Sequence, residues 1–322
     1  MTDPRVLRYV VEAIAPASAA HGEAARRRVA AAHAPLLDRL AVALGRAQHT
    51  AQPHARDRAI AVCAGDHGAG DPGIAVGAAH PTVIAAHEIA SGEAALVHVA
   101  RTGRASIVLI DAGAREAAAM PPTTVVLGGR PSRDLMAGPA MTLDDAAAAL
   151  ESGIALAVSL TEHGRDLLAV GALGVGAERA AAALLGAALG DVPAGLGDAG
   201  AQAAAARGAA FASAAALDQL AAFGGPETCV LAGLMLAAAA GHVPVILDGY
   251  ATAAAALAAA AFAPHVTGYL IAAHAGSLLQ PRILAHLGLH PIFDVGLGHG
   301  EGTGAAMILP LIDQVTALAG RG

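Results

Sequence analysis

The sequence predicts an α/β protein with a doubly wound, mostly parallel sheet of the Rossmann-like kind. Two observations lead to this fold class. Short apolar runs rich in Val, Ile and Leu alternate along the chain with longer alanine-rich stretches of helical length. Strands that are apolar throughout are buried on both faces, and helices between them supply the right-handed crossovers of a parallel sheet. A chain of 322 residues can form one large domain or two unequal ones.

The expected strands are the short apolar runs, most of which end at Gly or Asp. In chain order they are 59–64, 106–110, 124–127, 167–170, 243–247, 269–272 and a less regular run at 291–295. The stretches between them favour helix because alanine has the highest helix propensity. They are 81–101, 143–163, 178–189 and 228–240, and a further apolar helix is expected at 305–318.

The apolar composition does not indicate a membrane protein. Hydrophobic residues make up 56% of the chain, but much of that share is alanine, which is a weak membrane-insertion signal. The longest apolar run, 228–247, could cross a bilayer by length, yet Gly241, His242 and Pro244 interrupt it. A helix, a loop and a strand are therefore expected there. No basic patch followed by a long apolar segment opens the chain, so a cytoplasmic protein is expected.

Charge and cysteine content exclude further classes. The net charge of -7 argues against nucleic acid as a partner, because neutralising phosphates requires a basic surface. Cys63 and Cys229 stand far apart in apolar surroundings, so small buried side chains are expected rather than a disulfide framework. Asp66, His67, Asp71 and His80 could suggest a metal site. They lack ligand-like spacing, and no metal site is predicted.

Polar and glycine-rich turns follow the expected strands. They occur at 65–68, 111–113, 171–176 and 248–250, and further on at His274 and the loop 296–304. In open α/β sheets ligands bind beyond the carboxyl ends of the strands. These turns should therefore share one edge of the sheet and form the functional site.

Two of these turns have candidate chemistry. Glu301 stands among five glycines just before an apolar helix, which makes it either a catalytic base or simply a residue that caps the helix. The loop 171–176 precedes a helix expected near Ala177, so its backbone N–H groups could bind an anion. Its spacing differs from Gly-x-Gly-x-x-Gly, and no acidic residue follows about 20 positions further on at a strand end, which disfavours a dinucleotide.

Seven turns, in order, resemble those of the nicotinate-nucleotide:dimethylbenzimidazole phosphoribosyltransferase (CobT-like) family. The matching segments are 64–68 (Ala-Gly-Asp-His-Gly), 111–113 (Asp-Ala-Gly), 138–142 (Gly-Pro-Ala-Met-Thr), 223–225 (Phe-Gly-Gly), 247–250 (Leu-Asp-Gly-Tyr), 270–274 (Leu-Ile-Ala-Ala-His) and 300–306 (Gly-Glu-Gly-Thr-Gly-Ala-Ala). The last is similar to the family's catalytic loop. The resemblance implies that Glu301 is the catalytic base.

The resemblance also implies the reaction and the partners. A nitrogen of 5,6-dimethylbenzimidazole attacks C1′ of nicotinate mononucleotide, giving α-ribazole 5′-phosphate, which enters cobamide lower-ligand assembly, and free nicotinate. The partners are thus a small-molecule nucleotide and an aromatic base, and neither a metal nor another cofactor is needed. The family is dimeric and has a smaller helical domain made from both chain ends. For this chain that implies helical parts at 1–55 and 301–322 around an α/β domain at 56–300, and a homodimer.

By the same resemblance a set of residues surrounds the substrates. They are Asp66, His67, Gly77, Ala85, Gly171, Gly174, Gly176, Arg179, Asp248, His274, Gly300, Gly302 and Thr303. The chain departs from the family at several places, including the segment 195–206, which lacks the family's Lys, and the reduced N-terminal signature at 35–40. Ala172 replaces a Glu, 177–179 replaces Asn-Thr-Thr, and Gly77 and Ala85 replace a Ser and a Gln. We expect Arg179 to replace part of the lost phosphate contact, and the base pocket to be less polar and roomier.

Three functional alternatives remain at this point. The first is an active phosphoribosyltransferase, which the retention of Glu301 favours. The second is a catalytically impaired homologue that binds a nucleotide or acts as partner subunit of an active enzyme, which the loss of donor-side polar residues favours. The third is an unrelated α/β enzyme or a transporter fragment.

Overall fold

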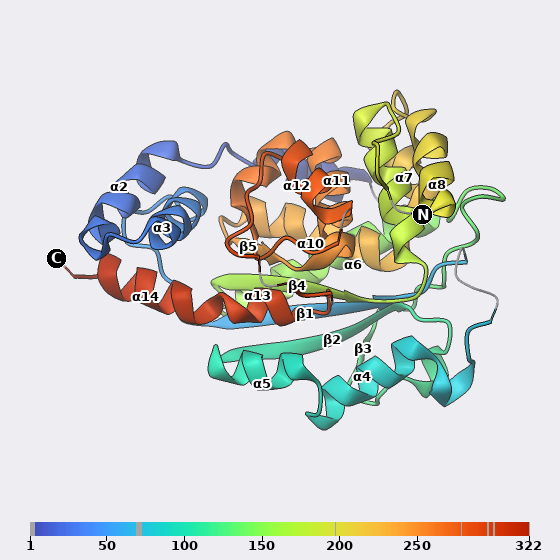
Figure 1. The fold of residues 1–322 in the computed structure, drawn as a ribbon, viewed down its shortest axis with the longest axis horizontal. Coiled ribbons are helices and arrows are strands. Elements are labelled where there is room, and N and C mark those ends of the chain that lie inside the picture. The colour runs from blue at the N-terminus through green and yellow to red at the C-terminus, as the bar shows by residue number, and fades with distance from the viewer. Residues whose placement is uncertain are drawn as a thin grey trace.

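Within the part of the chain that the structure describes, one parallel sheet of six strands forms the centre of the protein (Figure 1). The computed structural model describes residues 4–68, 73–196, 198–277, 279–294, 296–298 and 300–321. The strands are β1 (Arg58–Gly65), β2 (Ala105–Gly113), β3 (Val125–Val126), β4 (Leu167–Leu173), β5 (Val245–Leu247) and β6 (Leu270–Ala272). Their order is β3-β2-β1-β4-β5-β6, and every pairing is parallel. This is the strand order of a doubly wound Rossmann-like sheet, so the predicted fold class is confirmed.

The expected strand at 291–295 is the exception. Of its described residues, only Phe293 forms a bridge, to His274 beyond the end of β6. Pro291 has no backbone N–H to donate to a neighbouring strand, and Val295 lies outside the described residues. The prediction of a strand at 291–294 is therefore wrong. The segment lies beside β6 but does not continue the sheet.

Helices cover both faces of the sheet. They are α1 (Pro4–Ala13), α2 (Ala19–Val29), α3 (Pro35–Ala47), α4 (Pro81–Ser91), α5 (Ala95–Thr102), α6 (Leu143–Glu162), α7 (Ala177–Leu189), α8 (Ala199–Ala209), α9 (Ala216–Phe223), α10 (Pro226–Ala240), α11 (Gly249–Phe262), α12 (Leu279–His286), α13 (Thr303–Met307) and α14 (Leu309–Ala319). In Figure 1, α6, α10, α11 and α12 lie above the sheet, and α4 and α5 lie below it. Because helices cover both faces, side chains along β1 alternate between two hydrophobic cores. Ala61 and Cys63 pack into the upper core and Ile60 and Val62 into the lower one, because successive strand side chains point to opposite faces.

Glycines set the distance between two neighbouring helices, α6 and α10. A Cβ atom on Gly153 would lie 1.9 Å from the Val230 carbonyl oxygen, and one on Gly233 would lie 2.0 Å from the Leu150 carbonyl oxygen. Each helix thus places a glycine against the backbone of the other. The alanine-rich composition noted in the sequence serves such close packing, since small side chains let helix backbones approach.

Two of the expected helices are divided. The stretch 81–101 forms α4 and α5, because Gly92 ends α4 in a left-handed conformation with φ +88°. The helix expected at 305–318 is split into α13 and α14, since Pro310 cannot donate a helical hydrogen bond. Among the described residues, Pro81–Thr102 is the one stretch that is long and apolar enough to span a membrane. Length and composition alone are weak evidence for a membrane span, and the break at Gly92 interrupts this stretch. The longest apolar run forms α10, a turn and β5, as predicted.

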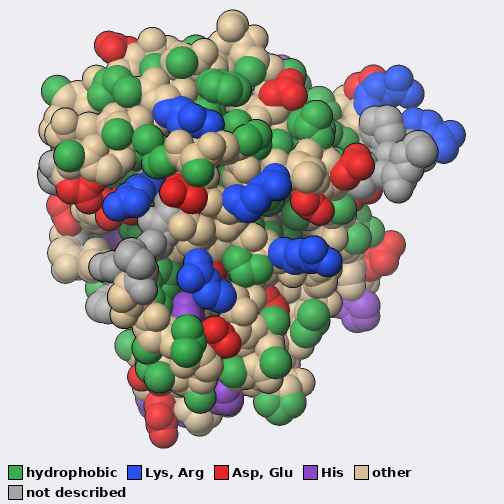
Figure 2. All heavy atoms as spheres, turned by 90° about the vertical axis from the view of Figure 1, so that its right-hand side faces the viewer, with side chains coloured by type: hydrophobic (Ala, Val, Ile, Leu, Met, Phe, Trp, Pro, Cys, Tyr) green, Lys and Arg blue, Asp and Glu red, His purple; other side chains and the backbone are tan. Residues whose placement is uncertain are grey.

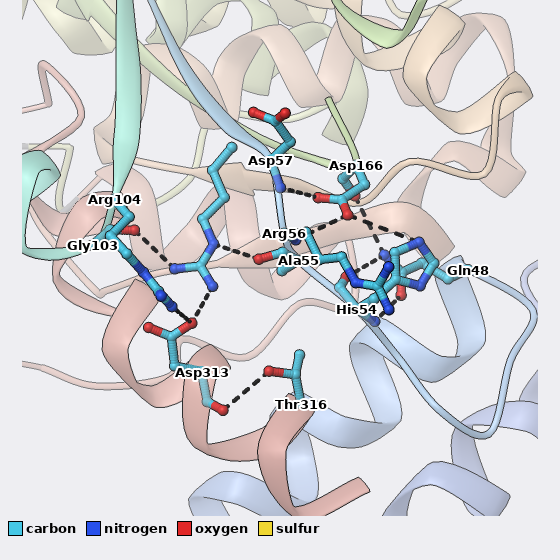
Figure 3. Close-up of polar contacts among 11 residues, drawn as sticks. Gln48, His54, Ala55, Arg56, Asp57, Gly103, Arg104, Asp166, Asp313 and Thr316 are labelled. Carbon is cyan, nitrogen blue, oxygen red and sulfur yellow. Dashed lines mark hydrogen bonds and ion pairs between the residues drawn. The ribbon is translucent and has the colours of Figure 1, made fainter. Parts of the chain in front are cut away.

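The C-terminal helix α14 joins the N-terminal helices. It packs against α2 and α3 at the end of the sheet where the strands begin (Figure 1). Figure 3 shows the polar contacts there: Asp313 of α14 accepts hydrogen bonds from the guanidinium groups of Arg58 and Arg104. The buried Arg58 also donates to the carbonyls of Ala55 and Gly103, each at 2.8 Å. The C-terminal helix therefore meets α2 and α3, whereas α1 packs against α6 and α10 at the other end of the view. The domain boundaries at 55 and 300 stay a prediction.

Candidate functional site

A cavity of about 560 Å³ opens at the carboxyl ends of β1 and β4. These two central strands are the point at which the strand order reverses, where doubly wound sheets bind ligands. This edge lies on the right in Figure 1 and faces the viewer in Figure 2, which shows basic side chains scattered among acidic ones across it. The cavity is lined by Pro81, Thr82, Ala85, Glu88, Ile89, Ala94, Ala95, Ala172, Leu173, Gly174, Val175, Ala177, Glu227, Tyr250, Ala251, Leu297, Gly298, Gly300, Glu301 and Thr303.

Glu301 lies at this cavity because its loop rests on the end of β4. A Cβ atom on Gly171 would lie 2.2 Å from the Glu301 carbonyl carbon, so only glycine lets the loop approach the strand this closely. The Ala172 amide donates to the Gly300 carbonyl at 2.9 Å. Thr303 donates its hydroxyl to Glu301 Oε1 at 3.2 Å. The side chain of Glu301 is thus half-buried and in contact with the cavity.

Asp248 holds the same loop from behind. Its Oδ2 accepts the amides of Gly302 at 2.6 Å and Gly304 at 3.2 Å, one on each side of Thr303. Its Oδ1 lies 2.5 Å from His274 Nε2, and both side chains are fully buried. Burial disfavours the charged imidazolium, but the hydrogen bond and charge of Asp248 outweigh it and raise the pKa of His274. Asp248 and His274 are absent from the cavity lining, and their contacts instead brace the loop that carries Glu301.

Asp66 connects three of the turns at this edge. Its carboxylate accepts the Thr82 hydroxyl at 2.6 Å, the Val175 amide at 2.9 Å and the Arg115 amide at 2.8 Å. These donors belong to α4, to the turn after β4 and to the turn after β2. The side chain is fully buried and does not line the cavity. Asp66 therefore fixes the turns relative to one another.

The turn between β4 and α7 has the form expected of an anion-binding loop. Gly174 lines the cavity, and a Cβ atom on it would lie 1.9 Å from the Gly65 carbonyl oxygen. Gly176 precedes α7 in a left-handed conformation with φ +85°, so the helix begins at Ala177 as predicted. Arg179 is exposed on the first turn of α7, and its guanidinium lies against Gly200 of α8.

Of the residues expected around the base pocket, some line the cavity and others lie outside it. Ala85 of α4 lines the cavity, whereas Gly77 lies in a 3₁₀ turn, Gly77–Ala79, outside the lining. His80 accepts the Thr82 amide at 3.3 Å and so caps α4. Asp71, considered in the sequence as a metal ligand, lies outside the described residues. Among those that are described, no group of three or more His, Cys, Asp or Glu side chains is arranged to hold a metal ion.

His67 forms a buried pair with Glu227. His67 Nε2 lies 2.9 Å from Glu227 Oε1, and the two residues are 1% and 2% exposed. Burial disfavours both charges, yet the partner outweighs it in each case, which raises the pKa of His67 and lowers the pKa of Glu227. Glu227 also lines the cavity, whereas His67 does not.

Glu227 and Tyr250 are cavity residues that the sequence analysis did not select. Tyr250 belongs to the matched segment 247–250, but it was not assigned to the site. Glu227 stands two residues beyond the matched Phe-Gly-Gly turn, at the start of a helix that is otherwise apolar. A single carboxylate in the first turn of a wholly buried helix was the signal that could have identified it, because an unpaired buried charge is costly.

Comparison with known proteins identifies the family. The sequence model of a phosphoribosyltransferase family matches residues 14–321. The chain belongs to this phosphoribosyltransferase family. It is 37% identical to nicotinate-nucleotide–dimethylbenzimidazole phosphoribosyltransferase of Salinispora tropica over 313 residues, covering 86% of this chain and 84% of the relative. The enzyme of the same name from Deinococcus radiodurans is 34% identical, with 98% and 93% covered.

A solved structure agrees with the family assignment. The crystal structure of CobT from Thermus thermophilus superimposes with a TM-score of 0.80 at 29% identity. The match covers 92% of this phosphoribosyltransferase and 95% of that chain. The resemblance inferred from seven turns is thereby confirmed. The protein is a pentosyltransferase by family, with the α/β fold expected for it.

Proposed function

We propose that this phosphoribosyltransferase transfers the phosphoribosyl group of nicotinate mononucleotide, or a related nucleotide, to a benzimidazole-type base. The product is then an α-ribazole phosphate for cobamide lower-ligand assembly. The names of the relatives support the substrates. The observation that carries the proposal is Glu301, a carboxylate held at the wall of a cavity of about 560 Å³ by braced glycine amides. That volume lies within the range of roughly 300–1,000 Å³ common for small-molecule pockets.

Glu301 is proposed as the general base. A bond forms between one nitrogen of the base and C1′ of the donor, while the bond between C1′ and the nicotinate nitrogen breaks. The leaving nicotinate takes that electron pair, which neutralises its positive ring nitrogen. The attacking base loses its N–H proton to Glu301. Such a transfer accelerates reactions by about 100- to 10,000-fold, and a base already bound beside the carboxylate avoids the entropy cost of an encounter.

The donor phosphate is proposed to bind at the turn before α7. Gly174 and Gly176 leave the backbone accessible there, and the helix that starts at Ala177 directs its positive end toward this turn. Arg179 adds a positive charge on the first helical turn. The Val175 amide already donates to Asp66, so the phosphate would use the amides that follow it.

The base is proposed to bind near α4, where the cavity wall is largely apolar. Ala85, Ile89, Ala94 and Ala95 lie on this side. Apolar contacts distinguish substrates that differ by one methyl group by only about 1–3 kcal/mol. We therefore expect benzimidazole and its monomethyl form to have kcat/KM values within roughly 200-fold of each other.

The test is a direct assay of the purified protein. Nicotinate mononucleotide is titrated by calorimetry, and nicotinate and the ribazole product are then quantified with dimethylbenzimidazole present. Glu301→Gln should reduce kcat by roughly 100-fold or more and leave donor affinity nearly unchanged. Glu88→Gln is the matched control, because Glu88 lines the same cavity with an exposed side chain. A wild-type protein that binds the donor without forming product would instead indicate an impaired homologue.

We also propose a cytoplasmic homodimer, which rests on the resemblance to the family. Sedimentation at equilibrium tests the oligomeric state, and a mass of one chain, 31.4 kDa, at micromolar concentration would contradict it. Fractionation of the producing cells tests the location.

A further inference from the structure

Glu227 presents an unused acceptor at the cavity. The side chain projects from the first turn of α10 and is 2% exposed. Its Oε1 atom accepts the Thr228 hydroxyl at 2.7 Å and pairs with His67 at 2.9 Å. Its Oε2 atom is buried and has no hydrogen-bond partner among the described residues. One oxygen of this carboxylate is therefore hydrogen-bonded within the protein, while the other can still accept a hydrogen bond.

The surrounding backbone leaves space for this carboxylate. A Cβ atom on Gly65, the last residue of β1, would lie 2.4 Å from Oε2, and one on Gly225 would lie 2.3 Å from it. Both positions need glycine for the Glu227 side chain to lie where it does. The two glycines thus leave the space that the Glu227 carboxylate occupies at the centre of the sheet edge.

The carboxylate is ionised in this setting. His67 lowers the pKa of Glu227 in spite of burial, and Ser132 lies 3.3 Å from the other ring nitrogen of His67. A buried acceptor without a partner destabilises the folded chain, and a charged one does so more strongly. A ligand that donates a hydrogen bond to Oε2 would remove this destabilisation. The best ligand group is therefore an O–H or N–H that enters the cavity.

We propose that Glu227 Oε2 accepts a hydrogen bond from a ribose hydroxyl of the nucleotide donor. This inference rests on the proposed function. Of the groups in nicotinate mononucleotide, the phosphate and the nicotinate carboxylate are anionic and would be repelled. The nicotinate ring nitrogen carries no hydrogen. The 2′- and 3′-hydroxyls of the ribose are thus the only strong donors, and the one N–H of the attacking base is assigned to Glu301.

The placement of the two carboxylates agrees with this assignment. Glu227 Oε2 lies against Gly65 at the end of β1, and Glu301 lies against Gly171 near the end of β4, the adjacent strand. A ribose between them would turn C1′ toward Glu301 and its hydroxyls toward Glu227. Because hydroxyl contacts orient the sugar, Glu227 acts here as a specificity-determining and positioning residue for the donor.

The experiment compares donors that differ by one hydroxyl. Dissociation constants of nicotinate mononucleotide and of its 2′-deoxy and 3′-deoxy analogues are measured by calorimetry for wild type, Glu227→Gln and Glu88→Gln. A hydrogen bond to a charged group is worth about 1.5–3 kcal/mol, so wild type should bind one of the deoxy analogues roughly 10- to 150-fold more weakly. Glu227→Gln should reduce the ratio of the two dissociation constants, deoxy analogue to parent donor, to about threefold or less. The exposed Glu88→Gln should keep the wild-type ratio.

Several outcomes would overturn the inference. Wild type that binds both deoxy analogues as tightly as the parent donor contradicts it, and so does a Glu227→Gln variant that discriminates like wild type. If Glu227→Gln does not fold, Glu227→Asp keeps the charge beside His67 but withdraws the oxygen, and the same loss of discrimination is expected. Turnover with dimethylbenzimidazole is recorded in parallel. A wild type that neither binds nor converts the donor refutes the proposed function and this inference together, whereas normal turnover with an unchanged ratio refutes the inference alone.

Discussion

Replacing Asp248 by asparagine should weaken both the fold and the reaction. The side chain is fully buried, and its two oxygens accept from the Gly302 and Gly304 amides and pair with His274. Asparagine has nearly the same shape but offers one neutral oxygen. It can keep the two amides only by turning its NH₂ group toward His274, which must then accept a hydrogen bond as a neutral ring.

The magnitude follows from these three contacts. A hydrogen bond to a charged group contributes about 1.5–3 kcal/mol and a neutral one about 0.5–1.5, so each contact loses roughly 1 kcal/mol. Asp248→Asn should therefore reduce the free energy of unfolding by about 2–4 kcal/mol. Because the two amides flank Thr303 next to Glu301, the loop should also shift. A displacement near 1 Å can reduce kcat on the order of 100-fold, with a smaller change in KM.

The measurements are urea unfolding and steady-state kinetics with saturating donor. Asp144→Asn is the control, because Asp144 is exposed at the start of α6 and the change should stay within about 0.5 kcal/mol. A variant with kcat within twofold of wild type would refute the bracing role of Asp248. An unchanged free energy of unfolding would refute the contribution of the buried contacts.

Three further predictions concern stability. The pKa of His67 is raised in the fold, so its stabilisation is complete below the unfolded pKa near 6.5 and is lost as pH rises through the folded pKa. The pKa of Glu227 is lowered, so its stabilisation is complete above the unfolded pKa of about 4.3 and is lost as pH falls through the folded pKa. Urea unfolding from pH 4 to 9 should thus show a stability advantage over His67→Gln that is greatest between these values. Arg58→Met should cost about 2–4 kcal/mol, because the buried guanidinium donates to the carbonyls of Ala55 and Gly103, which would be left without a donor. Gly233→Ala should cost about 1–3 kcal/mol by overpacking α10 against α6.

Each of the three stability predictions has a control or an outcome that would contradict it. Parallel pH profiles for wild type and His67→Gln would contradict the ionised pair. Arg104→Met removes the exposed partner of Asp313 and should cost at most about 1 kcal/mol, so equal losses at Arg58 and Arg104 would disprove the role of burial. A Cβ atom on Gly241 has no neighbour closer than 3.6 Å, and Gly241→Ala should be tolerated far better than Gly233→Ala. Urea unfolding measures all of these changes.

Most secondary structure could be predicted because it depends on local patterns. The run 59–64 is apolar throughout, and a strand between two helical layers has this pattern. The errors arose where one residue opposed its neighbours. Pro310 divided an apolar helix, and Gly92 divided another, although the apolar periodicity continued past both. The run 291–294 has strand-like residues but lies beyond the end of its neighbour, which no local pattern reveals.

The sequence by itself determined which turns form the functional edge, since residues that follow parallel strands must meet at one edge of the sheet. It also identified Glu301 as the candidate base. Only the tertiary structure decided what each residue contacts. Asp248 and Gly302 stand 54 positions apart, and His67 and Glu227 stand 160 apart, yet each pair is in contact. Such contacts depend on how strands and helices pack, and the spacing of residues along the chain does not encode them.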